Sequence, residues 1–422
     1  MGPQDDPASR VFGRHGRTPD PSVIDLALGS LRGFPALTNL WKGLEADGAG
    51  LLRGLDGYPG TQGPLGLLEA LAELWESERG APADPRHFVA THGALDAIGH
   101  ALATLPAGSP VIFAVPGFDY RLAIARVGCL PVPLLWPVGR GLSEFNDSLE
   151  AQLPKVGRCA AIIVCLPSNP GGVVAATAEW ERLRTLAARN GALLVVDDLY
   201  RFTGARTDGD VEGADVVVVD SLSKRFGGPG LRLGYAKASG PRLAKVRASM
   251  GRTSVGVSSL VATVGERALR RYLHQPAIAA EIRSGLARRR DAVRAALMSS
   301  QRSRLHLTDA GFYGCLQTPV LDSDALVRRL RDRGVLVTPG AGLFGALPAD
   351  VDRGQPFIRF CVGSDPRIAE AFDIICEEVL AAEELLAPHP MRRHAGAHFC
   401  TPLTERGSWA EPAHVPTETR RP

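Results

Sequence analysis

The chain has 422 residues, more than one ordinary hydrophobic core organises, so we expect two packed units. Hydrophobic residues make up 45% and charged residues 22%, as in ordinary globular proteins. The net charge of +3 gives no reason to expect nucleic acid or an anionic membrane as a partner. Its longest apolar runs are of strand length, so no membrane-spanning segment is expected.

Both chain ends are polar and contain Pro and Arg, which predicts disorder at residues 1–20 and 387–422. The N-terminus has no apolar stretch typical of a secretory signal. The seven cysteines are dispersed without a C-x-x-C pair, which favours a reducing compartment, and we expect a cytoplasmic protein. The spacing H-x-x-x-H-x-C at His394, His398 and Cys400 resembles a metal cluster, but it lacks a fourth ligand, so no metal is expected.

Apolar periodicity then predicts alternating helices and strands in chain order. Expected helices cover residues 65–78, 94–105 and 177–190, and expected strands cover 87–91, 111–116, 161–167, 192–198 and 215–220. This alternation predicts βαβ units in a buried, largely parallel sheet.

The pattern changes after about residue 258. A long amphipathic helix at 281–297 is predicted to bridge two domains, and two further helices are expected at 323–334 and 366–383. We therefore expect four parts before the tail: a disordered start (1–20), an N-terminal segment joining the small domain (21–45), a large domain (46–280) and a smaller α+β domain (281–386).

Polar side chains follow three of the predicted strands. Asn169 follows the strand at 161–167, and Lys224 follows the strand at 215–220. Asp197 comes directly after the apolar residues of the strand at 192–198, and Tyr200 follows it. In an open parallel sheet, ligands bind beyond the carboxyl ends of the strands. We therefore expect an amide, a carboxylate, a phenol and an amine to meet there.

Lys224 is one of five lysines, and glycines and a proline separate it from Arg232. A desolvated lysine amine can form a Schiff base, and arginine binds phosphate bidentately. Before the first of these strands, Gly93 and Ala94 open a predicted helix, where unsatisfied N–H groups favour an anion.

The stretch S-L-S-K-R-F-G-G-P-G-L-R-L-G (221–234) resembles the signature of class I/II (fold-type I) pyridoxal 5′-phosphate (PLP)-dependent aminotransferases. The resemblance extends from about Val23 to Leu380 and implies a large domain with a mostly parallel seven-stranded sheet. It places the PLP-binding lysine at Lys224. Phosphate contacts are implied at six positions: Gly93, Ala94, Leu95, Ser221, Ser223 and Arg232.

The same resemblance implies roles around the cofactor ring. Asp197 should hold the pyridine nitrogen, and Tyr200 and Asn169 should bind the ring O3′. Phe118 is expected to stack on the ring, with Tyr120 as the reserve.

Other implied roles concern the substrate and a second subunit. Arg359, in F-I-R-F (357–360), should bind the substrate carboxylate, with Gly29 and Asn169 as further substrate contacts. The implied role of Tyr58 is to reach the cofactor phosphate of the neighbouring subunit, so a homodimer is expected.

The resemblance implies transfer of an amino group between an α-amino acid and a 2-oxo acid. Two alternatives stay open. One is another PLP reaction: elimination or replacement, decarboxylation, or a cyclisation like that of capreomycidine synthase. It is motivated by departures from the family pattern at 116–121, Gly171 and Gly228. The other is a non-catalytic protein with this fold, against which the intact Lys224, Asp197 and Arg232 argue.

A run of three arginines, Arg288 to Arg290, falls inside the predicted bridging helix. We interpret it as a solvated helix face rather than a nucleic-acid patch.

Overall fold

A computed structural model describes residues 20–46, 48, 50–51, 55–157, 160–204, 213, 215–297, 303–318, 322–345, 347 and 356–385. The chain divides into two compact units, residues 1–386 and 387–422, and only the first contains described residues. The predicted tail with His394, His398 and Cys400, and residues 1–19 of the predicted disordered start, lie outside the described residues. The predicted divisions at residues 45 and 280 stay predictions.

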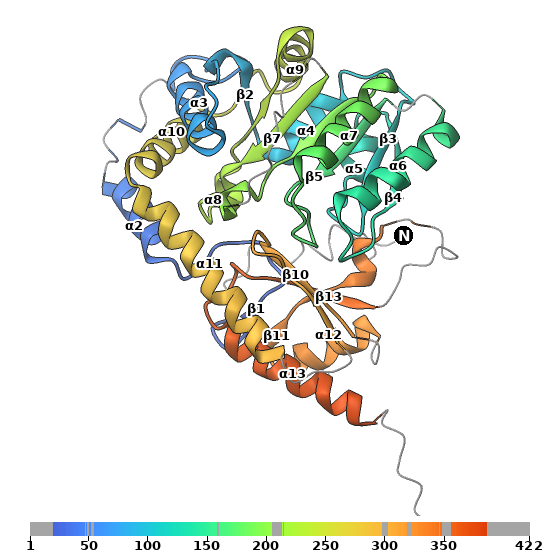
Figure 1. The fold of residues 1–422 in the computed structure, drawn as a ribbon. Coiled ribbons are helices and arrows are strands. Elements are labelled where there is room, and N and C mark those ends of the chain that lie inside the picture. Colours follow the sequence, from blue (N-terminus) through green and yellow to red (C-terminus); the bar gives the residue numbers. More distant parts are fainter. Residues whose placement is uncertain are drawn as a thin grey trace, which may run out of the picture. The chain divides into compact units, whose positions relative to one another are not determined.

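A seven-stranded sheet forms the centre of the structure (Figure 1), in the order β2-β8-β7-β6-β5-β3-β4. Its strands are β2 (Phe88–Thr91), β3 (Pro110–Val115), β4 (Leu130–Leu135), β5 (Ala161–Cys165), β6 (Leu193–Asp197), β7 (Val216–Ser221) and β8 (Gly234–Lys237). All neighbours pair in parallel except β8, which is antiparallel to both β2 and β7. β5, β6 and β7 are buried along their whole length, as runs of Val, Ile and Leu between two helix layers require. The predicted mostly parallel seven-stranded sheet is confirmed.

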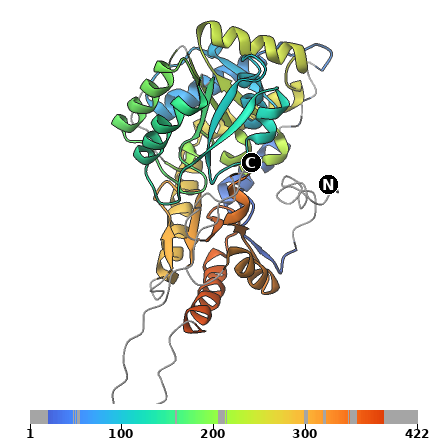
Figure 2. The same cartoon turned by 90° about the vertical axis from the view of Figure 1, so that its right-hand side faces the viewer.

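Helices cover this sheet, and α6 and α7 lie together on one side of it (Figure 2). The helices of this part are α3 (Leu65–Arg79), α4 (Ala94–Leu102), α5 (Arg121–Arg126), α6 (Leu142–Val156), α7 (Thr177–Arg189), α8 (Leu222–Arg225), α9 (Gly240–Thr253) and α10 (Ser259–His274).

A smaller α+β region follows in the chain and includes the N-terminal segment. It has an antiparallel sheet in the order β12-β13-β10-β9 and a parallel pair, β1 with β11. Its strands are β1 (Ile24–Asp25), β9 (Arg304–His306), β10 (Tyr313–Gln317), β11 (Val335–Leu336), β12 (Thr338–Pro339) and β13 (Phe357–Cys361). Its helices are α12 (Ser323–Asp332) and α13 (Ile368–Leu385), while α2 (Pro35–Ala46) follows the N-terminal segment. The predicted smaller α+β part is thus confirmed.

The long helix α11 (Pro276–Ala296) runs from the large sheet to the smaller one (Figure 1). It begins five residues before the predicted start, because Pro276 occupies the first turn, where proline's missing N–H costs no hydrogen bond. It packs against α13, with Ile278, Ile282, Leu286 and Val293 on its buried face. No helix within the described parts of the chain is long and apolar enough to cross a bilayer.

Candidate active site

Three neighbouring strands deliver the predicted polar side chains to one edge of the large sheet. Asp197 is the last residue of β6, Lys224 lies in the short helix α8 directly after β7, and Asn169 follows β5. Because β5, β6 and β7 are parallel neighbours, their carboxyl ends meet. The structure therefore brings together the amide, carboxylate and amine that the sequence singled out.

Lys224 is half-buried, and its Nζ donates a hydrogen bond of 2.6 Å to the carbonyl oxygen of Gly29. Burial lowers the pKa of Lys224 to about 8, and the nearby guanidinium groups of Arg359 and Arg232 act in the same direction. An amine with this pKa is partly neutral near physiological pH, as a nucleophile must be.

Asp197 is buried, and only one of its two carboxylate oxygens has a hydrogen-bond partner among the described residues. Its Oδ2 accepts a 2.5 Å hydrogen bond from the hydroxyl of Tyr120, whereas its Oδ1 has no partner among the described residues. Burial raises the pKa of Asp197, and the hydrogen bond from Tyr120 partly offsets this rise, so that the pKa is about 6. A buried acceptor without a partner is costly, which indicates that a donor from a ligand belongs there.

Arg359 lies on β13 and reaches across to Asn169. One guanidinium nitrogen donates to Asn169 Oδ1 at 3.3 Å, and the other donates to Thr338 Oγ1 at 3.1 Å and to the Ala27 carbonyl at 3.3 Å. The guanidinium stacks over the ring of Tyr313, 4.4 Å from its centroid, and the buried Nε has no partner in the described part of the chain. The amide of Asn169 also donates to the hydroxyl of Tyr200 at 3.3 Å.

A second group of residues can hold an anion next to Lys224. Gly93 precedes α4 with φ +93 and no side-chain cap, which leaves first-turn N–H groups at Ala94 and Leu95 without a capping side chain. Arg232 lies beside this turn: a Cβ on Gly93 would stand 2.7 Å from its Nη2. Ser221 and Ser223 are both buried here, and the Ser221 hydroxyl accepts from the Ser223 N–H at 3.3 Å. These groups together suit a phosphate.

The predicted stacking residue and its reserve are neighbours, with Phe118 and Tyr120 rings 5.2 Å apart. Tyr120 is buried and its hydroxyl donates to Asp197, whereas Phe118 is half-buried. The stacking role of Phe118 stays a prediction.

Two predicted residues lie outside this cluster. The side chain of Tyr58 is 90% exposed, and Leu95 is 40% exposed, so any part that Leu95 plays at the anion site falls to its backbone N–H. Gly29, in contrast, belongs to the cluster. Its carbonyl oxygen binds Lys224, and the neighbouring side chains leave no room for a side chain at this position. A Cβ there would stand 2.9 Å from Lys224 Nζ and closer still to the Tyr313 hydroxyl.

Sequence reasoning missed two residues of the cluster, the Asp197-binding role of Tyr120 and the whole contribution of Tyr313. Tyr313 begins β10 in the smaller region, 89 positions after Lys224 in the numbering, and no short motif links it to the sheet edge. The one available signal for Tyr120 was its place after β3, the next strand in the sheet beyond β5.

Ion pairs of the residues adjacent to Lys224 and Asp197 fix the segments that carry the site. Arg225, next to Lys224, binds Glu78 and lies 3.0 Å from Asp220, and Asp198, next to Asp197, binds Arg79 at 2.5 Å and Arg201 at 2.9 Å. Glu78 and Arg79 belong to α3, so one helix fixes both the segment that carries the Lys224 amine and the segment that carries the Asp197 carboxylate.

No group of three or more potential metal ligands occurs within the described ranges. Among the described residues, the cluster offers a free carboxylate oxygen at Asp197 and anion-binding groups around Arg232, which could hold an organic ligand that carries a donor and a phosphate.

Comparison with known proteins gives consistent findings. The model of the family described as "Aminotransferase class I and II" matches residues 21–375. The aspartate aminotransferase of Thermococcus kodakarensis is 29% identical over 348 residues, 79% of this chain and 84% of that one. A Bacillus subtilis protein named as an aminotransferase is 27% identical over 227 residues, which span 51% of this chain and little more than half (57%) of that protein. A mutant Thermus thermophilus aspartate aminotransferase superposes with a TM-score of 0.69 at 21% identity, covering 87% of this chain and 99% of that one, a likeness of fold.

Proposed function

Because the chain belongs to the class I and II aminotransferases, a family of PLP-dependent transferases, we propose that it transfers an amino group between an α-amino acid and a 2-oxo acid. Lys224 is the residue to which PLP attaches. The observation that carries this proposal is a half-buried amine with a lowered pKa beside a buried carboxylate, one oxygen of which has no partner among the described residues. The alignments span different aminotransferases, so the substrate's side chain is a separate question.

The residues present fit PLP group by group. Asp197 Oδ1 matches a protonated ring nitrogen, and the hydroxyl of Tyr200 and the amide of Asn169 match the ring oxygen. Arg232, Ser221, Ser223 and the start of α4 match the phosphate. Bound PLP would act as an electron sink that stabilises negative charge on the substrate Cα.

The protein's own groups would supply the proton transfers. Lys224 Nζ would be the base that takes the proton from the substrate Cα. Its pKa of about 8 suits this task, because a base near the working pH both accepts and returns a proton. Asp197 would hold the proton at the ring nitrogen, and Tyr120 would keep Asp197 in its carboxylate form.

Arg359 is proposed to bind the substrate α-carboxylate. Its Nε is buried without a partner in the described residues, so a carboxylate oxygen would complete its hydrogen bonding. Asn169 and the Gly29 segment would line the same position, since both already contact Arg359 or Lys224.

A homodimer is part of the proposal. Tyr58 is exposed together with other apolar side chains of the 55–65 and 255–260 stretches, and Gly256 lies against Gly60. These exposed side chains are Leu55, Leu65, Val255 and Leu260. A second copy would cover this surface and bring Tyr58 to the partner's cofactor phosphate. The cytoplasmic location expected from the cysteine pattern stays a prediction.

The test is to incubate the PLP-loaded protein with a panel of α-amino acids and follow both the cofactor spectrum and the products. Formation of pyridoxamine 5′-phosphate with an equivalent of 2-oxo acid is expected. Turnover without the pyridoxamine form contradicts transamination and favours elimination, replacement, decarboxylation or cyclisation. Lys224→Ala should lose the visible absorbance of bound PLP, whereas the matched variant Lys245→Ala, altered at an exposed position of α9, should keep it. If PLP leaves no absorbance on the unaltered protein, a non-catalytic protein is indicated.

A further inference from the structure

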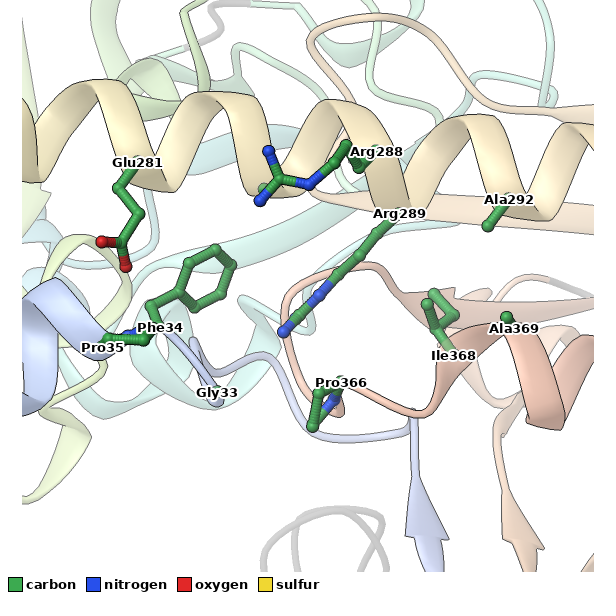
Figure 3. Close-up of a pocket in the computed structure, with 11 residues that line it drawn as sticks. Gly33, Phe34, Pro35, Glu281, Arg288, Arg289, Ala292, Pro366, Ile368 and Ala369 are labelled. Carbon is green, nitrogen blue, oxygen red and sulfur yellow. The ribbon is translucent and has the colours of Figure 1, made fainter.

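A pocket of about 510 Å³ lies apart from the candidate active site, between the N-terminal segment, α11 and the start of α13 (Figure 3). Its size is within the range of small-molecule sites. Most of its wall is apolar, formed by Gly33, Phe34, Pro35, Gly285, Ala292, Pro366, Ile368 and Ala369. None of its lining residues belongs to the proposed cofactor or substrate site.

The polar part of the wall comes from α11. Arg288 and Arg289 line the pocket, and Glu281 lies two turns earlier on the same helix (Figure 3). Glu281 Oε1 accepts a hydrogen bond from the Ala36 N–H at 2.9 Å, so this carboxylate caps the first turn of α2. Arg288 is exposed and makes no hydrogen bond or ion pair with any described residue.

Arg289 is held in place from the other side. Its two terminal nitrogens donate to the Gly363 carbonyl at 2.9 Å and the Arg32 carbonyl at 2.7 Å, and its guanidinium lies 4.5 Å from the centre of the Phe34 ring. These partners are neutral, so its positive charge is not cancelled by them. The nearby Asp365 is paired with Arg367.

The first residues of α13, Ile368 and Ala369, form part of the same wall. Glu370 in the first turn offsets the partial positive charge of this helix end, so the charge at the wall comes from two lining arginines against one lining glutamate, Glu281. An excess of positive charge therefore borders an apolar hollow.

We propose that this pocket binds a small organic anion, with a carboxylate or phosphate group on Arg288 and Arg289 and an apolar body against the exposed lining residues Pro35, Pro366 and Ala369. In this proposal, two residues of the arginine run that the sequence suggested to be a solvated helix face, Arg288 and Arg289, bind a ligand. This site is additional to the proposed aminotransferase site, and its occupancy does not depend on PLP chemistry.

The experiment measures binding of 4-phenylbutyrate to the PLP-loaded full-length protein by isothermal titration calorimetry. The uncharged 4-phenylbutyramide is the ligand control. Arg288→Gln removes the free guanidinium, and Ala369→Trp fills the hollow without altering charge at the wall. Arg283→Gln is the matched control, because Arg283 is exposed on the same helix but does not line the pocket. Arg359→Lys reports binding at the candidate active site instead.

We expect 4-phenylbutyrate to bind the unaltered protein, Arg283→Gln and Arg359→Lys alike, and the amide to bind more weakly. Arg288→Gln and Ala369→Trp should each weaken binding by roughly tenfold or more, the effect of losing a charged hydrogen bond or the apolar contact. No binding to the unaltered protein overturns the proposal. Loss of binding in Arg359→Lys with retention in Arg288→Gln also overturns it, because the probe then occupies the active site.

Discussion

At the scale of single residues, one hydroxyl group controls the charge of Asp197. Burial alone disfavours the carboxylate, and the 2.5 Å hydrogen bond from Tyr120 opposes that effect. With the two combined, the pKa of Asp197 is about 6, so the group is a carboxylate at neutral pH. A pyridinium nitrogen needs that charged form.

Tyr120→Phe should therefore raise the pKa of Asp197 further. A hydrogen bond to a charged group is worth about 1.5 to 3 kcal/mol, which corresponds to roughly one to two pH units. We expect the acidic limb of PLP affinity, measured as dissociation constant against pH, to move to higher pH by about one unit. Asp197→Asn, which cannot titrate, should lack this limb. An unchanged midpoint, or one moved to lower pH, would show that Tyr120 does not set the charge.

Arg359→Lys should separate substrate binding from cofactor binding. Lysine keeps the positive charge but loses the planar pair of donors and the stacking on Tyr313. We expect KM for the amino acid to rise about tenfold or more, while the affinity for PLP stays within about twofold. Steady-state kinetics and PLP titration check this, and a loss of PLP affinity with unchanged KM contradicts the assigned role.

Side chains that follow strands were predictable from the sequence, because the carboxyl ends of parallel strands share one edge. Asn169, Asp197 and Lys224 do meet there. The Gly29 carbonyl contact with Lys224 spans 195 positions, and the Tyr120 contact with Asp197 spans 77. Such contacts depend on tertiary packing and leave no local pattern.

At the scale of elements, the N-terminal segment between β1 and α2 passes directly beside Lys224. A side chain at position 29 would meet Tyr313 and Lys224, so only glycine fits without displacement. Gly29→Ala should weaken PLP binding by about tenfold or more, because the lysine amine must move. Gly99→Ala, within α4, is the matched control, since a Cβ there meets no atom within 4 Å. Equal PLP affinity in both variants would show that this contact is dispensable.

The ion pairs that tie α3 to α8 should matter for stability. Arg225 is buried with Glu78 and Asp220, so Arg225→Met leaves two carboxylates without their cation. We expect the free energy of unfolding to fall by about 3 to 5 kcal/mol near pH 8. Arg182→Met, which breaks exposed pairs with Asp147 and Glu150, should cost about 1 kcal/mol or less. Denaturant unfolding measures both.

The loss of stability caused by Arg225→Met should depend on pH. Burial raises the pKa of Asp220 to about 7 even with Arg225 present, and removing the cation raises it further. A carboxyl whose folded pKa is raised loses stability as pH rises from its unfolded pKa to its folded pKa. The cost of Arg225→Met should therefore be smaller at pH 5, where Asp220 is protonated, than at pH 8. A pH-independent cost would contradict the role of Asp220.

The elements that apolar periodicity predicted have the predicted type and order, whereas their ends differ from the prediction, and β4, α6, α9 and α10 were not predicted. The predicted helix at 94–105 ends at Leu102, and the predicted helix at 281–297 begins at Pro276. Periodicity weakens in end turns, where capping and packing against neighbours decide the last residues. The antiparallel strand β8 was also missed, because G-Y-A-K is too short and mixed to give a period.

At the scale of the whole molecule, the proposal requires two copies. Tyr58 is 90% exposed in one chain, and across a dimer it would reach the partner's phosphate. Light scattering of the PLP-loaded protein should give twice the chain mass, and Tyr58→Phe should weaken PLP binding by about threefold to tenfold without changing that mass. A monomeric mass for an active protein would contradict the dimer.

The central claim is that Lys224 holds the cofactor, and the most direct measurement is the position of the covalent attachment. The PLP-loaded protein would be reduced with sodium borohydride, digested and analysed by mass spectrometry. We predict the phosphopyridoxyl group on the peptide containing Lys224. Its appearance on Lys42, Lys155, Lys237 or Lys245, or on no lysine, would contradict the account.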